Sequence, residues 1–284
     1  MKKKILSVIT AIAMVASLTA CGGSKVATEA TTADATVADA TTADAVATTT
    51  DAAKSEITGA GVSTEGKLIM ATNAEFAPYE YHDNNEIVGI DVEIAKAIAE
   101  KMGLELEIED IAFDSIIPEI TSGKADIGAA GMTVTEDRMK NVDFSDTYAH
   151  AAQVIIVKSD STIKSADDLK DMKIGVQLGT TGDLYASGDF GDENVERFAK
   201  GFEAVQALSQ GKIDAVIIDR EPAKIFSEET EGLTILDESY TDEDYAISVK
   251  KGNTELLDNI NAAIAELKAD GTLDSIVAKY IKAE

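Results

Sequence analysis

The sequence is short of the residues that build disulfides and metal sites. Its 284 residues include one cysteine, two histidines, three prolines and no tryptophan. One cysteine cannot form an intramolecular disulfide, and His82 and His150 lie far apart with no cysteine beside them, so the spacing typical of a metal site is missing. No spacing indicates a catalytic triad either, although triads are assembled in space. We therefore expect a fold held by its core, with no metal and no cofactor.

Positive charge is also scarce. Lysine and arginine number 25 against 52 aspartates and glutamates, which gives a formal net charge of -27. Such acidity favours solubility and opposes contact with polyanions. We expect no nucleic-acid partner.

Long apolar runs are confined to the N-terminus. Three lysines at positions 2–4 precede the apolar run at residues 5–18, and small residues follow before Cys21. A cationic start, a short apolar stretch and a small-residue cleavage site form an export signal, and the run is too short to span a membrane.

The cleavage site Leu-Thr-Ala-Cys resembles the lipobox of bacterial lipoproteins. The resemblance implies that Cys21 carries a lipid and becomes the mature N-terminus. Residues 1–21 would then be the signal peptide. Two alternatives are an ordinary secreted protein with a stray thiol and an uncleaved N-terminal anchor.

Residues 22–65 consist mainly of alanine, threonine and aspartate, and the pentapeptide TTADA occurs twice. This composition offers too little apolar bulk to offset the entropy of ordering, so we expect a disordered tether. A helix is the alternative, although threonine and aspartate disfavour it.

The remaining chain alternates strand and helix patterns, which predicts an α/β fold with mostly parallel sheets. The predicted helices include residues 91–102, a short helix with Asp114 as its N-cap, a helix from Thr135 and a helix at 202–210. The predicted strands include residues 68–72, 104–108, 126–130, 153–157, 173–177, 195–198 and 213–219.

Two similar segments, SGKADIG at residues 122–128 and QGKIDAV at residues 210–216, indicate two similar lobes. Ligands of open α/β sheets gather beyond the carboxyl ends of strands. There the first lobe offers Arg138 after a Gly-Met-Thr stretch, and the second offers Asp219. This pair suits a ligand with a carboxylate and an ammonium on one carbon. Alternatively, Arg138 forms a surface salt bridge and Asp219 caps a helix.

From residue 68 to the C-terminus the sequence resembles the polar amino-acid-binding proteins of ABC importers, which have the type II periplasmic-binding-protein fold. The matching stretches are LIMATNAEFAPYEY, GIDVEIAKAIAEKMG, AFDSIIPEITSGKADIGAAGMTVTEDRMKNVDFSDTY, KIGVQLGTTG, GKIDAVIID and DGTLDSIVAKY. Each motif alone is weak, but together and in this order they are specific.

The resemblance implies a role for each matching position. Arg138, Thr133, Thr181 and the backbone at Gly131 would hold the ligand's α-carboxylate, and Asp219 its α-ammonium. The aromatic rings of Phe76 and Phe113 would enclose its side chain, and Asn73, Glu75 and Gln177 would read the far end. Core packing is the alternative for the two rings, and solvation on an exposed loop is the alternative for Glu75.

The resemblance further implies two lobes joined by a two-strand hinge near residues 148–152 and 241–246. Lobe 1 would comprise residues 66–151 and 247–284, and lobe 2 residues 152–246. The protein would be a monomer, anchored by its lipid on the extracytoplasmic face of the cell membrane, that passes a free amino acid to the permease and ATPase subunits of an importer.

The side chain of the ligand stays open between polar and basic. None of the matched specificity positions is a lysine or arginine, which argues against glutamate and aspartate. Two other functions remain. One is a cyclohexadienyl or arogenate dehydratase-like enzyme, for which Glu75 would supply the carboxylic acid; the other is a ligand-loaded sensor. Asp219 favours binding without turnover, because a carboxylate that binds an ammonium group would have no partner in prephenate.

Overall fold

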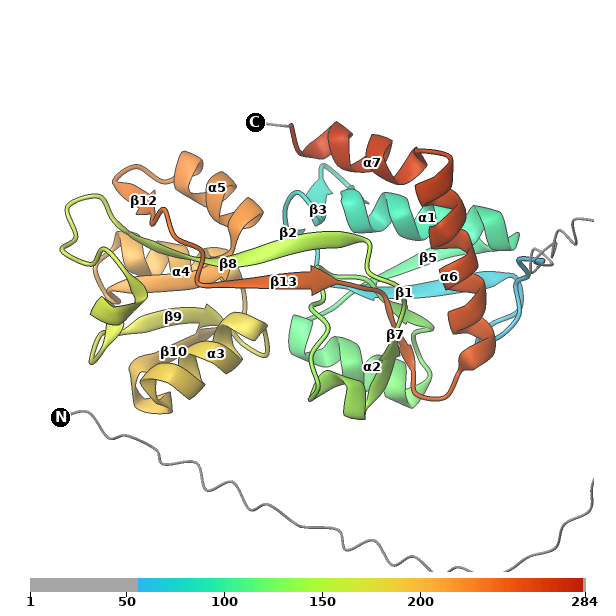
Figure 1. Ribbon diagram of the computed structural model, residues 1–284, viewed down its shortest axis with the longest axis horizontal. Helices are drawn as coiled ribbons and strands as arrows, with labels where there is room; N and C mark the ends of the chain where they lie inside the picture. The colour runs from blue at the N-terminus through green and yellow to red at the C-terminus, as the bar shows by residue number, and fades with distance from the viewer. Residues whose placement is uncertain (1–55, 283–284) are drawn as a thin grey trace, which may run out of the picture. The chain divides into compact units, whose positions relative to one another are not determined.

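The computed structural model describes residues 56–282 (Figure 1), all of which belong to one compact unit. The predicted signal peptide, Cys21 and the tether up to residue 55 lie outside this range. Across residues 56–282, no helix has both the length and the apolar character needed to cross a membrane.

Lobe 1 is built on a five-stranded sheet in the order β5-β1-β6-β14-β7. Strands β1 and β5 pair in parallel along six residues, and β1 also pairs in parallel with β6, whereas β14 runs antiparallel to β6 and β7. The bounds are β1 Lys67–Thr72, β5 Glu105–Asp110, β6 Ile127–Gly128, β7 Val142–Phe144 and β14 Ser248–Lys250.

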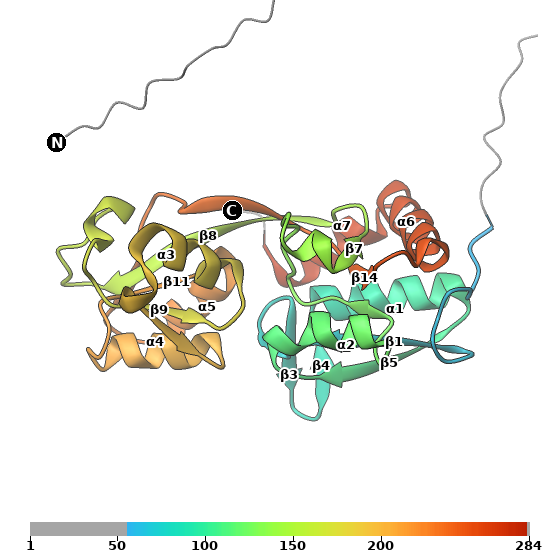
Figure 2. The ribbon, with the colours of Figure 1, turned by 90° about the horizontal axis from the view of Figure 1, so that it is seen from below.

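Helices cover both faces of this sheet (Figure 2). Leu68 and Met70 of β1 join the core that contains α1 (Ile90–Met102), α6 (Thr254–Ala269) and α7 (Thr272–Tyr280). Ala71 joins a second core with α2 (Ile116–Ser122), which follows η1 (Phe113–Ser115). The side chains of β1 alternate between faces, as expected for a strand buried on both sides.

A small antiparallel sheet lies beside lobe 1 and includes two segments of the site. It contains β2 (Glu75–Phe76), β3 (Glu80–Asp83) and β4 (Glu86–Val88). Phe76 pairs with Glu80, which fixes the two side chains close to each other in the sheet register.

Lobe 2 has a sheet in the order β10-β9-β11-β8-β12, and β13 also pairs with β8. Helix α3 lies over one face, and α4 and α5 lie over the other, because alternate residues of β8 and β11 join different cores. The bounds are β8 Ala149–Lys158, β9 Ile174–Gln177, α3 Thr181–Phe190, β10 Val195–Phe198, α4 Gly201–Ser209, β11 Ala215–Asp219, α5 Arg220–Glu229, β12 Leu233–Ile235 and β13 Thr241–Tyr245. Three short 3₁₀ segments are η2 Arg138–Lys140, η3 Ala166–Leu169 and η4 Asp192–Asn194.

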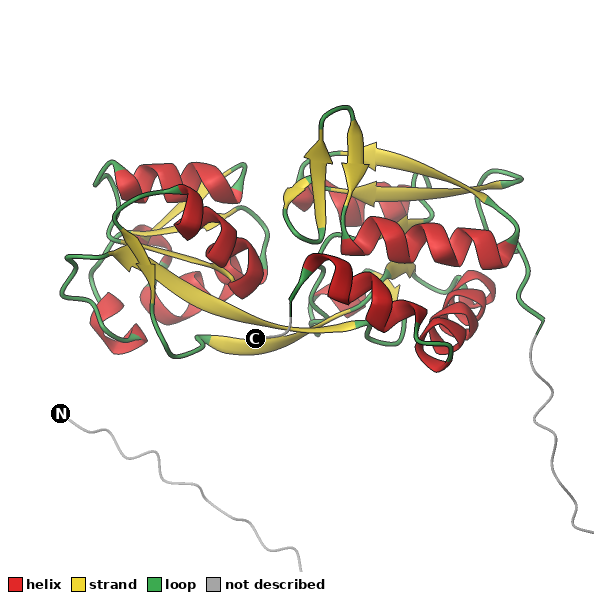
Figure 3. Ribbon diagram, turned by 90° about the horizontal axis from the view of Figure 1, so that it is seen from above, coloured by secondary structure: helices red, strands yellow, loops and turns green. Residues whose placement is uncertain are grey.

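Strands β8 and β13 run between the lobes side by side (Figures 1 and 3). They pair antiparallel from Thr241 opposite Gln153 to Tyr245 opposite Ala149. This pair coincides with the segments predicted as the hinge, and the predicted lobe boundaries fall within β8 and just after β13.

The structure corrects four predictions about the fold. Both sheets are mixed rather than mostly parallel, because β8 and β14 each add antiparallel pairings where the chain passes between lobes. The expected helix from Thr135 is only the 3₁₀ turn η2, whose first amide, that of Arg138, donates to the Thr135 hydroxyl. Asp114 lies inside η1 and is not an N-cap.

The fourth correction concerns the end of the tether, which the sequence predicts at residue 65. The Thr58 amide donates a 2.8 Å hydrogen bond to Asn259, and the Ser63 amide donates a 2.6 Å bond to Asp126. Ile57 also packs against the core of lobe 1. Residues 56–65 therefore belong to the folded unit.

Candidate functional site

An enclosed cavity lies between the lobes, and nine of the ten predicted ligand-binding residues line it. Eight lining residues come from lobe 1 and four from lobe 2; they are Asn73, Phe76, Glu80, Phe113, Ala130, Gly131, Thr133, Arg138, Gln177, Thr180, Thr181 and Asp219. Glu75 is absent from this set. The space left between these side chains, about 10 Å³, suffices for about one water molecule. A larger ligand can therefore enter only if the lobes separate.

Arg138 is placed for recognition of an anion. Its side chain is buried, and its Nη1 and Nη2 donate to the carbonyl oxygens of Thr133 at 2.7 Å and Gly179 at 3.2 Å. Its guanidinium carbon lies 5.3 Å from the centre of the Phe113 ring. Burial lowers the pKa of Arg138, while nearby carboxyl groups raise it, and an arginine remains charged at any physiological pH. Because carbonyl groups satisfy only part of this buried fork, a carboxylate is a fitting further partner.

Gly131 brings backbone close to the Phe76 ring at the cavity. Its φ of +52° is in the left-handed region, and a Cβ at this position would lie 2.7 Å from the Phe76 ring. Its amide donates a 2.8 Å hydrogen bond to Asp91, at the start of α1. A side chain at this position would therefore both strain the backbone and fill the cavity.

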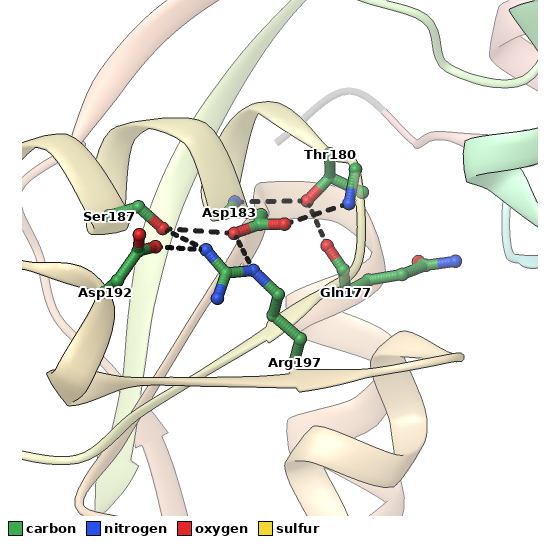
Figure 4. A network of polar contacts seen from close by, with 7 residues as sticks. Gln177, Thr180, Asp183, Ser187, Asp192 and Arg197 are labelled. Atoms are coloured by element: carbon green, nitrogen blue, oxygen red, sulfur yellow. Dashed lines mark hydrogen bonds and ion pairs between the residues drawn. The ribbon is translucent and has the colours of Figure 1, made fainter.

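The turn between β9 and α3 carries Thr181 and is held by a polar network (Figure 4). The Thr180 hydroxyl accepts from the Asp183 amide and donates to the Gln177 carbonyl, so Thr180 is the N-cap of α3. Asp183 in turn accepts from the Gly179 amide at 3.0 Å and from Arg197 Nε at 2.8 Å. The network aims the start of α3, with its free amides, at the cavity.

Arg197 anchors this network from β10. Its Nη2 donates to Ser187 and Asp192, at 2.8 and 2.6 Å, while its Nε holds the buried carboxylate of Asp183. Arg197 was not among the predicted site residues, since nothing in the spacing of residues 183 and 197 indicates that they meet.

Asp219 is the last residue of β11 and lines the cavity from lobe 2. Its Oδ1 accepts a hydrogen bond from the Tyr245 hydroxyl. Burial is the main cause that raises the pKa of Asp219 to about 7, and the charge of Glu243 adds to it. Glu243 accepts from Thr133 and Gln153, each at 3.0 Å. Two carboxyl groups, those of Asp219 and Glu243, thus lie near the single guanidinium of Arg138. This excess of acidic groups favours a positively charged group of the ligand.

Glu80 lines the cavity and was missed by the sequence analysis. Its side chain is fully buried, and neither carboxyl oxygen has a conventional donor within the described residues. Burial, together with Asp91 and Asp219, raises the pKa of Glu80 well above its usual value. A faint signal was present, since Glu80 stands between Tyr79 and Tyr81, and aromatic side chains are typical of a half-buried strand.

Glu75 lies outside the cavity, contrary to the prediction. Its carboxylate forms an ion pair with Lys200 of lobe 2, and it lines a separate open groove with Phe202 and His82. Because successive side chains of a strand point to opposite faces, Phe76 faces the cavity and Glu75 faces away.

Within residues 56–282, no three histidine, cysteine, aspartate or glutamate side chains gather as a metal site would require.

Residues 68–283 match the family model described as bacterial extracellular solute-binding proteins, family 3. The chain belongs to this family. It is 36% identical over 242 residues to "Arginine-binding extracellular protein ArtP" of Bacillus subtilis, covering 80% of this chain and 93% of that protein.

Two solved structures place this solute-binding protein among its relatives. An ancestral arginine-binding protein bound to arginine is 44% identical, with a TM-score of 0.72 over 76% of this chain and 98% of that chain. An ancestral arginine-binding protein bound to glutamine is 43% identical, with a TM-score of 0.74 over 78% and 100% of the two chains. These relatives share the fold with two sheet-rich lobes.

Proposed function

We propose that this protein captures a free amino acid, preferably one with a basic side chain, between its lobes and delivers it to an ABC importer. One observation carries the proposal: Arg138 and Asp219, with opposite charges and from opposite lobes, face the same cavity. A molecule with a carboxylate and an ammonium on one carbon satisfies both. It therefore contacts both lobes and favours their closure.

The charges around the cavity support a basic ligand. Glu80 and Asp219 line it, and Arg138 is the one cation among the twelve lining residues. An acidic side chain would add a negative charge with no second cation to meet it. Proteins similar to this one include arginine-, histidine-, cystine- and glutamine-binding proteins, so a neutral polar ligand is the nearest competitor.

A thermal-shift screen of the 20 amino acids and cystine tests the proposal, followed by calorimetry. We expect arginine to give the largest shift. Arg138→Ala and Asp219→Ala should each weaken binding by about 2–5 kcal/mol, because each leaves a buried charge of the ligand unpaired. Tight binding of glutamate, or near wild-type affinity in either variant, would contradict the assignment.

A specific observation favours a second candidate, an enzyme that protonates its substrate. Glu80, not the predicted Glu75, lines the cavity as a carboxyl group with a raised pKa, as Asp219 also does. The family and its named relatives support binding instead. Incubation of the protein with prephenate or arogenate decides between them, and conversion of either would support the enzyme.

We further propose that the protein acts as a monomer, tethered by a lipid on Cys21 to the extracytoplasmic face of the membrane. The lysine-rich start, the apolar run and the Leu-Thr-Ala-Cys site support the anchor. A Cys21→Ser chain should remain an unprocessed precursor or leak into the medium. Mass spectrometry that finds unmodified Cys21 in the mature protein would contradict it.

A further inference from the structure

Two buried carboxyl groups, those of Glu80 and Asp91, lie within hydrogen-bond reach of each other beside the cavity. Glu80 is fully buried on β3 and lines the cavity, and Asp91 is buried in the first turn of α1. Asp91 Oδ2 accepts from the Gly131 amide at 2.8 Å and from the Tyr148 hydroxyl at 2.6 Å. Asp91 Oδ1 and both oxygens of Glu80 have no conventional donor within the described residues.

A proton shared between the two carboxyl groups explains why these oxygens need no other donor. Two ionised carboxylates in a buried site repel each other, whereas one carboxylic acid can donate a hydrogen bond to its carboxylate neighbour. Asp91 already accepts two hydrogen bonds that stabilise its charge, so Glu80 is the partner that holds the proton. Burial and the charge of Asp91 both raise the pKa of Glu80, in agreement with this order.

Within residues 56–282, no cation is among the groups that shift the pKa of Glu80. Asp91 from α1 and Asp219 from β11 are the charged groups that raise its pKa. The phenols of Tyr79 and Tyr148 also face it. Tyr245 of β13 is bonded to Asp219, and the guanidinium of Arg138 is bonded to the carbonyls of Thr133 and Gly179.

We propose that Glu80 and Asp91 share one proton in the empty site and release it to solvent when a cationic group of the ligand binds beside Glu80. The exchange keeps the charge of the buried cluster constant, since one positive charge enters as another leaves. Glu80 is then a ligand-recognition residue and Asp91 its positioning residue. The proposal rests on the proposed function, because it requires a cationic ligand.

Proton release makes the affinity depend on pH. If binding releases one proton, the affinity increases about tenfold for each unit by which the pH rises, as long as the pH stays below the pKa of the releasing group in the free protein. Asp219, whose pKa is about 7, adds its own share. The number of protons that Glu80 releases is therefore the difference in proton release between the wild-type protein and Glu80→Gln.

Calorimetry with L-arginine at pH 7.0, in phosphate and in imidazole buffer, counts the protons released on binding. We expect release by the wild-type protein and a release smaller by up to one proton in Glu80→Gln. In Asp91→Asn, loss of the neighbouring negative charge should move the midpoint of the affinity profile to lower pH. This shift would not follow from a merely structural role. Glu107→Gln is the matched control, because Glu107 lies on β5 in an exposed pair with Lys67.

Each outcome has one reading. Arginine that binds without proton release, or an unchanged proton count in Glu80→Gln, would overturn this inference and leave the proposed function standing. Absence of arginine binding to the wild-type protein would instead contradict the proposed basic specificity. If Glu80→Gln does not fold, the wild-type proton count and the Asp91→Asn profile still decide the question.

Discussion

The side-chain amide of Gln177 in lobe 2 donates a 2.8 Å hydrogen bond to the side-chain oxygen of Asn73 in lobe 1. Arg138 reaches the Gly179 carbonyl, and Lys200 pairs with Glu75, between the same two lobes. These three contacts join the two lobes across the cavity. Each of them stabilises the closed arrangement in addition to the contacts that a ligand makes with both lobes.

Removal of the contact between Gln177 and Asn73 should shift the empty protein toward the open arrangement. A net contribution of about 0.5–1.5 kcal/mol per hydrogen bond corresponds to a change of roughly two- to tenfold in the ratio of open to closed molecules. Small-angle scattering of Gln177→Ala, with spin-label distances between the lobes, measures this ratio. Gln206→Ala, on the exposed side of α4 in the same lobe, is the control. Equal distance distributions in both variants would show that the contact does not hold the lobes.

Arg197 should matter both for stability and for binding. Arg197→Met leaves the buried carboxylate of Asp183 without its cation, which we expect to cost about 1–3 kcal/mol of unfolding free energy. Because Asp183 also holds the Gly179 amide, the turn that presents Thr181 should loosen and the affinity for arginine should fall. Urea unfolding and calorimetry measure the two effects. Lys67→Met removes an exposed ion pair and should change neither the unfolding free energy nor the affinity. An unchanged affinity in Arg197→Met would show that the network does not support ligand binding.

The charge of Glu75 should have little influence on selectivity. Its carboxylate points out of the cavity to Lys200, so Glu75→Gln should leave the ratio of arginine to glutamine affinity unchanged within about twofold. Closure itself can weaken slightly for both ligands, because a half-exposed ion pair contributes up to about 1 kcal/mol. Calorimetry with both amino acids gives the ratio. A selective loss of arginine binding would place Glu75 in the site after all.

The sequence allowed the cavity to be predicted better than its surroundings. Arg138, Thr133, Thr181 and Asp219 follow strand ends in recognisable motifs, and the carboxyl ends of strands define a common edge. Glu75 and Phe76 are adjacent in one motif, so only the direction of β2 decides which of them faces the cavity. The fold itself was predicted as α/β with two lobes, but not the mixed pairing of its sheets.

Tertiary packing determined what the sequence could not show. Lys200 meets Glu75 only because the lobes close on each other, and the residues are 125 positions apart. Glu80 and Asp91 come together because β3 packs against the start of α1, which the pattern of neither segment indicates.

The buried carboxyl groups should make the empty protein less stable as the pH rises toward neutrality. The pKa values of Asp219 and Asp91 are raised from 3.8 to about 7 and about 6 in the folded protein. Between pH 4 and 7 the unfolded chain has therefore lost protons that the folded protein still holds. Folding then binds protons, and the free energy of unfolding decreases as the pH rises through this window.

Urea unfolding of the empty protein at pH 5, 6, 7 and 8 measures this slope. Asp219→Asn removes the group with the higher of the two pKa values, so its stability should decline less between pH 5 and 7 and level off nearer pH 6. Asp168→Asn is the control, since hydrogen bonds lower the pKa of Asp168 and its stability contribution is lost only as the pH falls below about 4. Saturation with arginine should flatten the wild-type profile, because a bound cation stabilises the ionised carboxylates as the pH rises. A wild-type stability that increases from pH 5 to 7 would contradict the assignment of raised pKa values to this cluster.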